Sequence, residues 1–296
     1  MKKNHVIEFE SKDRILEKAK RYIECVESFL DGGDQAISLL LRAMKHADSE
    51  LKREIMFILG TFAKEEFVWP LYNLMSDPSE LPEIRNDAAI QLSVIGPFLK
   101  EPQPLINRLL EAIDSPDPER RLHATFALGW KGNSQAAIPL IERLFDSDLQ
   151  VQQTAVNALC NLRDDRVLDL LLDRLSRGPV EQKRIILFNL WRFYSKKEKV
   201  TQVYLRYLEH KDPDLRFDAL VCMGPMTRAR DHLDAYRKCL KDKDGRIREL
   251  ALKRLSEEAR ASALKTLRAE IGALLNDPNM KVKKAALKIL TTKNTE

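Results

Sequence analysis

The strongest constraint on the fold is a ten-residue segment that recurs eight times and aligns without gaps. The copies begin at Leu51, Ile84, Arg120, Val151, Gln182, Leu215, Ile247 and Val282. Their starting points lie 31 to 36 residues apart, with a mean of 33, so length changes fall between the copies. A period of this size is typical of solenoid proteins, in which each repeat is one supersecondary unit.

Apolar residues occupy the same positions in every copy. With the first residue counted as zero, position four is Ile or Ala in all eight copies, and position eight is Leu in seven and Met in one. At about 100° per residue, positions zero, four, five and eight share one side of a helix. Each copy therefore predicts an amphipathic helix, and the alanines predict close helix contacts.

A second stretch with helical apolar periodicity precedes each copy. These stretches cover residues 36–44, 70–75, 104–113, 138–145, 167–175, 200–208, 232–240 and 264–275. Turns rich in Asp and Pro follow them, and their Asp or Asn side chains can cap the free N–H groups of the next helix. Each repeat is thus predicted to contain a first helix and an antiparallel second helix.

A single helix pair of this length cannot bury its apolar face, so neighbouring pairs must stack. We predict an all-α fold, an α-solenoid of about eight helix pairs, with residues 35–296 as one continuous domain. Residues 1–34 predict an N-terminal cap, in which an amphipathic helix over residues 1–30 ends at a Gly-Gly turn.

The second helices resemble a known repeat class. The segments that begin at Asp148, Asp212 and Asp244 are similar to the Asp-x-x-Val-Arg-x-x-Ala-x-x-Ala-Leu-Gly helix of HEAT repeats, in particular the short HEAT-like repeats also found in phycobilin lyases. Prolines early in the first helices, such as Pro70 and Pro104, fit the same pattern. The resemblance covers about 250 residues and implies a helical repeat protein.

The resemblance also implies a structural ladder of ion pairs. Position one is basic in seven of the eight copies. In HEAT-like proteins this residue pairs with a loop Asp three to four residues earlier. The residues concerned are the aspartates Asp48, Asp117, Asp148, Asp212 and Asp244 and the arginines Arg85, Arg121, Arg216 and Arg248.

The side of the second helix opposite the buried side carries positions two, six and ten, and should line a concave groove. Position six is apolar in five of the first six copies, and exposed apolar patches often mark partner surfaces. The predicted partner-binding residues are Phe57, Phe126, Trp130, Phe188, Trp191, Arg184 and Arg192. The alternative is that these aromatic residues pack against one another as a second core.

Several kinds of chemistry are not indicated by the sequence. The five histidines are scattered, none precedes Glu, and the four cysteines lack paired spacing, so neither a metal site nor a disulfide framework is predicted. Phosphate-binding glycine loops and nucleophile-elbow motifs are absent. We predict no catalytic residue, metal or cofactor. With 44% apolar residues, no membrane-length apolar stretch and no signal-like start, a cytoplasmic location is predicted.

Charge is unevenly distributed along the chain. Residues 1–180 carry 23 Lys and Arg against 29 Asp and Glu, whereas residues 181–296 carry 27 against 16. A basic end can attract nucleic acid, an acidic protein or the acidic end of a second copy. Nucleic-acid binding would use the basic C-terminal repeats through Lys253, Lys281, Lys283, Lys284 and Lys288.

The sequence therefore predicts a non-enzymatic scaffold that binds a partner protein or peptide along its groove. The alternatives are a nucleic-acid-binding protein and a protein similar to the phycobilin lyases. Resemblance to the HEAT-like alkylpurine DNA glycosylases would give active-site roles to Trp191, Arg184, Arg192 and Asp218.

Overall fold

The computed structural model describes residues 11–258 and 261–292 and contains only helices and connecting turns over these ranges. The α-helices are α1 (Lys12–Glu24), α2 (Val26–Met44), α3 (Ser49–Phe62), α4 (Val68–Ser76), α5 (Pro82–Ile95), α6 (Gln103–Ala112), α7 (Pro118–Leu128), α8 (Ala137–Arg143), α9 (Leu149–Asn161), α10 (Arg166–Arg177), α11 (Val180–Asn189), α12 (Lys197–Tyr207), α13 (Pro213–Met223), α14 (Leu233–Cys239), α15 (Gly245–Glu258), α16 (Ala261–Thr266), α17 (Arg268–Ala273) and α18 (Met280–Thr292). The predicted all-α solenoid is confirmed.

The repeat register predicted from the sequence is also confirmed. The eight copies form the second helices α3, α5, α7, α9, α11, α13, α15 and α18. Position four is buried in all eight. Small side chains there let neighbouring helices approach closely, as in ridge-into-groove packing.

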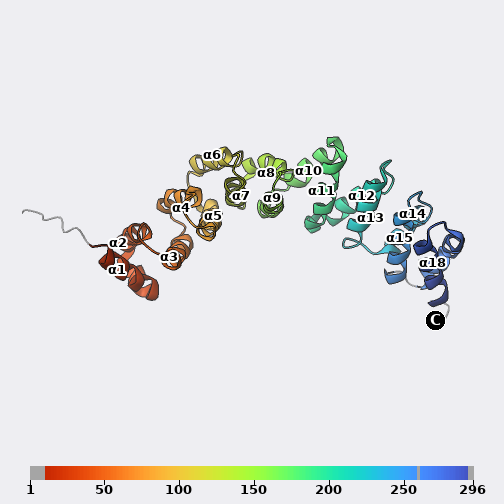
Figure 1. Ribbon diagram of the computed structural model, residues 1–296, viewed down its shortest axis with the longest axis horizontal. Helices are drawn as coiled ribbons and strands as arrows, with labels where there is room; N and C mark the ends of the chain where they lie inside the picture. Colours follow the sequence, from red (N-terminus) through yellow and green to blue (C-terminus); the bar gives the residue numbers. More distant parts are fainter. Residues whose placement is uncertain (1–10, 259–260, 293–296) are drawn as a thin grey trace, which may run out of the picture. The chain divides into compact units, whose positions relative to one another are not determined.

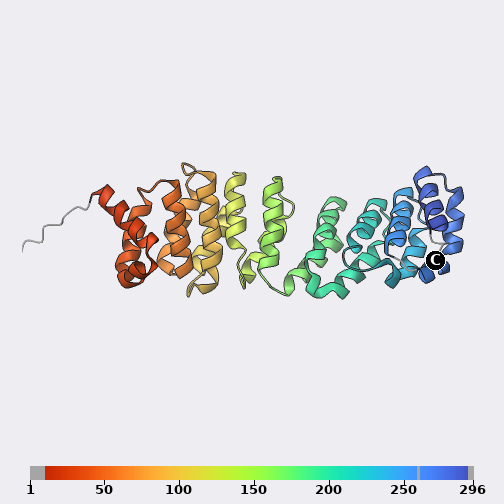
Figure 2. The ribbon, with the colours of Figure 1, turned by 90° about the horizontal axis from the view of Figure 1, so that it is seen from below.

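First and second helices form two layers within each unit of the chain. In residues 1–164, the first helices α4, α6 and α8 lie on one side and the second helices α5, α7 and α9 on the other (Figure 1). In residues 165–296, α12 and α14 face α13 and α15 in the same way (Figure 1). Seen from below, successive helices lie side by side in each unit (Figure 2).

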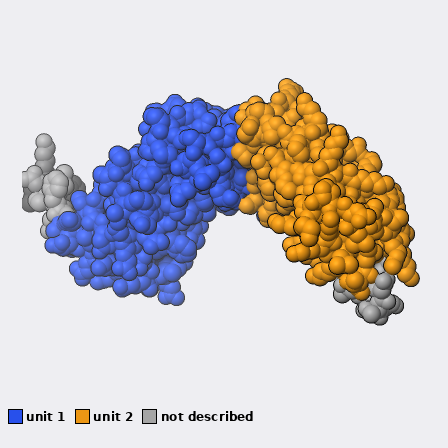
Figure 3. All heavy atoms as spheres, turned by 45° about the vertical axis from the view of Figure 1, so that its right-hand side comes forward, with its two compact units in different colours: residues 1–164 blue, residues 165–296 orange. Residues whose placement is uncertain are grey.

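The chain separates into two compact units, unit 1 (residues 1–164) and unit 2 (residues 165–296), shown in Figure 3. Each unit has its own core, because the apolar residues of its first and second helices are buried against each other. A single continuous domain over residues 35–296 stays a prediction, as does the capping role of residues 1–34, of which 1–10 lie outside the described residues.

The N-terminal segment differs from the single helix predicted for residues 1–30. The helix breaks at Cys25, whose backbone is extended, so α1 and α2 are separate. α2 then continues through Gly33, which has a φ of 49°, a left-handed conformation that glycine adopts at little cost. The Gly-Gly segment is therefore a kink within α2, and the second part of α2 is the first helix of the first repeat.

Candidate interaction surface

Aspartates at the start of the second helices act as N-caps. Asp48 accepts a hydrogen bond from the backbone N–H of Leu51 at 2.9 Å, and Asp117 accepts one from Glu119 at 3.1 Å. Asp148, Asp212 and Asp244 make equivalent bonds. These side chains satisfy N–H groups that the helix itself leaves unpaired.

The predicted pairing of these aspartates with the basic residue at position one is wrong. Arg121 instead donates to both carboxylate oxygens of Asp146, at 2.9 and 2.7 Å. Arg216 reaches Asp242 and Arg248 reaches Asp277 in the same bidentate way, while Arg85 pairs with Glu119. In each case the carboxylate lies one repeat further along the chain. The nearer aspartates of Arg121, Arg216 and Arg248 already serve as caps, and Arg85 has no Asp at that distance.

The acceptors Asp146, Asp242 and Asp277 were missed from the sequence. Each stands two residues before the cap and also accepts its backbone N–H, as Asp146 does from Asp148 at 3.0 Å. Burial opposes ionisation of Asp146, but the bonds from Arg121 and Asp148 outweigh burial and lower its pKa. The Asp-x-Asp or Asp-x-Asn spacing was the available signal. We call the three pairs Arg121–Asp146, Arg216–Asp242 and Arg248–Asp277, with the loops that hold the aspartates, the loop edge.

A second kind of Arg–Asp pair lies on the side of the second helices that carries positions two, six and ten, which we call the second-helix face. Arg53 of α3 donates to Asp87 of α5 at 2.6 Å, and Arg184 of α11 donates to Asp218 of α13 at 2.5 and 3.2 Å. Both join position two of one repeat to position three of the next. The bond to Asp218 raises the pKa of Arg184. Asp218 is fully buried, so it is held as a partner of Arg184 and not presented to a nucleobase as the glycosylase resemblance implied.

In unit 1, the predicted residue Phe57 is exposed and lines a mainly apolar hollow of about 510 Å³. Ile23 and Val26 line the same hollow from the N-terminal helices, together with Arg53 and Asp87. The hollow thus places an exposed ring beside a charged pair.

The structure does not place Trp130 on this surface. Trp130 is buried against Gly96, where a Cβ atom would lie 2.4 Å from the indole ring. Trp130 fits there because Gly96 has no side chain. Trp130 is therefore a packing residue, and the predicted partner-binding role is wrong. Phe126 is only partly exposed, less than Phe57 and more than Trp130.

In unit 2, exposed aromatic side chains gather where α11 ends. Phe188, Trp191 and Tyr194 are 42, 45 and 59% exposed. Trp191 and Arg192 lie in the 3-10 turn η4 (Leu190–Arg192), and Tyr194 begins the 3-10 turn η5 (Tyr194–Lys196). We call Phe188, Trp191, Arg192 and Tyr194 the aromatic patch. Tyr194 was missed because it lies beyond the ten-residue copy that ends at Trp191.

Cations lie against two rings of the aromatic patch. The guanidinium carbon of Arg192 is 5.2 Å from the centroid of Trp191, and Nζ of Lys197 is 5.7 Å from that of Tyr194. Both distances are within the range of cation–π attraction. Both rings keep about half of their surface exposed beside these cations.

The residues that the structure describes include a buried histidine and two buried cysteines. They contain no group of three His, Cys, Asp or Glu side chains placed to bind a metal ion. His123 is buried, and this burial lowers its pKa to about 4. Burial raises the pKa of Cys222 and of Cys239 to about 12, which disfavours the reactive thiolate.

No helix within residues 11–258 and 261–292 is long and apolar enough to span a membrane.

Comparison with known proteins agrees with this architecture. Residues 106–191 match the family model of HEAT repeats. A solved structure that describes Kap95p binding to RanGDP contains a chain with 12% sequence identity and a TM-score of 0.54, and the match covers 95% of this chain and 42% of that one. An engineered protein matches with 19% identity and a TM-score of 0.39, over 96% of this chain and 84% of its own. No curated protein matches the sequence.

At this level of identity, the likeness to the Kap95p structure is one of fold. Three observations indicate the same repeat fold: the burial of position four, the capped starts of the second helices, and the segment that matches the HEAT family model. The chain is therefore an all-α solenoid that contains HEAT repeats.

Proposed function

We propose that this protein is an interaction scaffold that binds a partner protein or peptide on the second-helix face, with the aromatic patch of unit 2 as its main contact. The observation that carries the proposal is the exposure of three large aromatic side chains within seven residues. Trp, Tyr and Arg are enriched among the residues that dominate binding energy at protein interfaces. The Kap95p structure, which shares the fold, contains a protein partner.

The composition of the patch favours an acidic, apolar partner segment. Arg192 and Lys197 lie against the rings, and Arg184 projects from the same second helix with a half-exposed side chain. An apolar side chain of the partner would cover Phe188 and Trp191, and a nearby carboxylate would approach the arginines. Charge-assisted bonds of this kind fix orientation as well as adding affinity.

The exposed surface of unit 1 around Phe57 supports a second, smaller contact. It repeats the same elements, a phenylalanine at position six and an Arg–Asp pair at positions two and three. Its hollow of about 510 Å³ can hold one or two side chains. Partners that contact both units would gain affinity from the linkage of two weak sites.

The test is a nuclease-treated pull-down from the source cell, followed by measurement of Kd with the purified partner. Phe188→Ser/Trp191→Ser should lose the partner that the wild type retains. Phe98→Ser is the control, because Phe98 is an exposed phenylalanine of unit 1, outside the aromatic patch. A partner that is retained equally by the wild type and the double variant would overturn the proposal.

Nucleic-acid binding is a second candidate, supported by the exposure of Lys253, Lys281, Lys284 and Lys288 on α15 and α18. It predicts an affinity for DNA or RNA that falls linearly on a log–log plot against salt concentration. A partner held by aromatic rings should respond less to salt. Retention of nucleic acid before nuclease treatment, with no protein retained afterwards, would favour this candidate.

A further inference from the structure

The last second helix, α18, exposes a residue that the other second helices bury. Position five is at most 6% exposed in the first seven copies, whereas Leu287, at position five of α18, is 54% exposed. Around the helix, position five lies between positions one and nine. Position one of α7 contacts the following repeat through Arg121 and Asp146, and position nine does so through Gly129, where a Cβ atom would lie 2.6 Å from that of Ala158. Position five therefore faces the following repeat.

The exposed side of α18 thus has the chemistry of a repeat-packing surface. Met280 is also exposed on this side, two residues before the copy begins. Lys283 occupies position one, where Arg121 and Arg248 reach a carboxylate of the next repeat, and Lys284 beside it is exposed. We call Met280, Lys283, Lys284 and Leu287 the α18 end face. A complementary surface must be apolar and must carry carboxylates.

The first helix of the described chain has a different exposed side. α1 buries Ile15 and Ala19, and its fully exposed residues are charged, among them Arg14, Glu17 and Lys20. The α18 end face instead exposes the apolar side chains of Met280 and Leu287.

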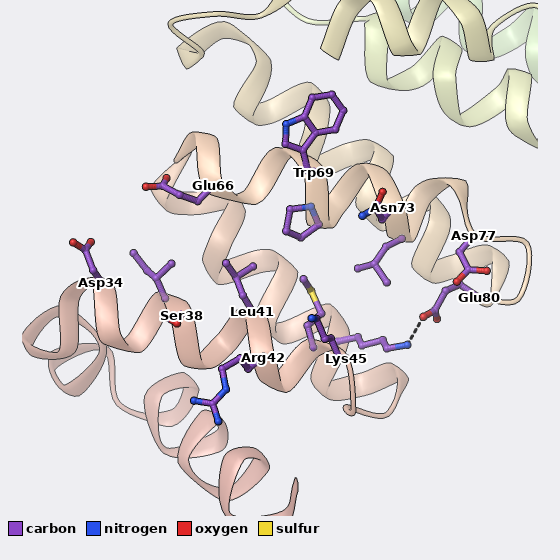
Figure 4. A pocket seen from close by; sticks show the side chains of 15 residues that line it. Asp34, Ser38, Leu41, Arg42, Lys45, Glu66, Trp69, Asn73, Asp77 and Glu80 are labelled. Carbon is purple, nitrogen blue, oxygen red and sulfur yellow. Dashed lines mark hydrogen bonds and ion pairs between the residues drawn. The ribbon is translucent and has the colours of Figure 1, made fainter. Parts of the chain in front are cut away.

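A surface that meets both requirements lies on the first-helix side of unit 1. Between α2 and α4, a groove of about 750 Å³ is lined by Ile37, Leu41, Pro70 and Leu74, with the half-exposed Trp69 on one wall. We call it the first-helix groove. In Figure 4, Asp34 and Glu66 stand at one end and Asp77 and Glu80 at the other.

Cations pair with two of these four acids. Lys64 is bonded to Asp34 and Lys52 to Glu80, whereas Arg42 points away from Trp69 (Figure 4). Lys45 is the remaining cation of the lining. Hydrogen bonds from Ser79 lower the pKa of Asp77, which keeps that carboxylate charged at neutral pH.

The charges of the two units agree with this pairing. Unit 1 carries 20 Lys and Arg against 26 Asp and Glu, and unit 2 carries 30 against 19. Contact between two α18 end faces would oppose like charges, whereas contact with unit 1 of another copy joins opposite charges.

We propose that the α18 end face of one copy docks in the first-helix groove of a second copy. Leu287 and Met280 pack on Leu41, Trp69 and Leu74, and Lys283 and Lys284 approach the carboxylates at the ends of the groove. The interface is heterologous, because each copy contributes a different surface. Such contacts build open chains when the rotation between copies does not close a ring.

Sedimentation velocity tests the proposal on the full chain. The wild type should show a weight-average sedimentation coefficient that rises with concentration and falls again as salt screens the charges. Leu287→Glu and Trp69→Ser/Glu66→Lys should each sediment as a monomer. Leu149→Glu is the matched control, because Leu149 is an exposed leucine elsewhere on unit 1, and it should associate as the wild type does.

Mixing the two blocked variants tests the polarity of the interface. Each retains one intact surface of the pair, so an equimolar mixture should form a 1:1 dimer and grow no further. Circular dichroism establishes that each variant is folded. A wild type that stays monomeric at all concentrations, a groove variant that still associates alone through α18, or a mixture that stays monomeric would each overturn the proposal.

Discussion

Arg121 on the loop edge and Arg53 on the second-helix face make the same kind of bond in different surroundings. Each donates to an aspartate of the following repeat. The Arg121 and Asp146 side chains are 10 and 3% exposed, whereas those of Arg53 and Asp87 are 59 and 24% exposed. A buried pair cannot lose one partner without leaving an uncompensated charge, while an exposed pair is solvated and screened. The pair of Arg121 with Asp146 is therefore structural, whereas the pair of Arg53 with Asp87 can open to solvent at little cost.

The largest effect is expected from removing Arg121. Arg121→Ala leaves Asp146 buried without its bidentate donor and should lower the free energy of unfolding by about 3–5 kcal/mol. Urea unfolding followed by tryptophan fluorescence measures it, because Trp130 is buried in the same unit. Arg120→Ala, at the exposed neighbouring position, should change stability by less than about 0.5 kcal/mol. Equal effects of the two substitutions would remove the distinction drawn for the loop edge.

His123 extends the comparison to a buried group that gains nothing from being charged. Burial, followed by the charge of Arg85, lowers its pKa from 6.5 to about 4, so the unfolded chain binds the proton more readily. Stability should be complete above pH 6.5 and fall by up to about 3 kcal/mol as pH drops from 6.5 to 4. His123→Phe should flatten the stability profile in this window. A wild-type profile that is already flat there would contradict the pKa.

Trp130 tests how tightly the repeats pack behind the second-helix face. Gly96→Ala would place a Cβ atom 2.4 Å from its indole ring and should destabilise the protein by about 1–3 kcal/mol through overpacking. Gly272→Ala is the control, because no atom lies within 4 Å of the new methyl group, and the helix preference for alanine should make it neutral or stabilising. Thermal unfolding of both variants provides the comparison, and a neutral Gly96→Ala would show that the indole can move aside.

The smallest effect is expected on the second-helix face. Arg53→Ala should cost no more than about 1 kcal/mol, because the pair with Asp87 is exposed and its side chains lose freedom on pairing. A double-mutant cycle with Asp87→Ala isolates the interaction energy. A coupling as large as that of Arg121 with Asp146 would show that this face is as structural as the loop edge.

Most of the fold could be predicted from patterns that are local in the sequence. The period, the apolar positions and the Asp caps involve residues within one helix or turn, so the sequence predicted the repeats and the burial of position four. The partner of Arg121 could not be predicted in the same way, because Asp146 lies 25 residues later and becomes a neighbour only when repeats stack.

The candidate site was predicted less well for a similar reason. A helical wheel assigns Phe188 and Trp130 to one face, but exposure depends on what the neighbouring repeat offers. Gly96 makes room for Trp130, whereas Phe188 stays exposed. The end of α11 at Asn189 also places Trp191, the last residue of its copy, in a turn, which a fixed repeat alignment does not anticipate.

The most direct test of the central claim measures stability and binding on the same variant. Phe188→Ser/Trp191→Ser removes two of the three exposed rings of the aromatic patch while leaving the loop edge intact. We predict a free energy of unfolding within about 1 kcal/mol of the wild type, because substitutions of exposed side chains cost little, together with loss of the partner that the wild type retains. A variant that binds the partner as the wild type does, or that is destabilised as strongly as Arg121→Ala, would contradict the account.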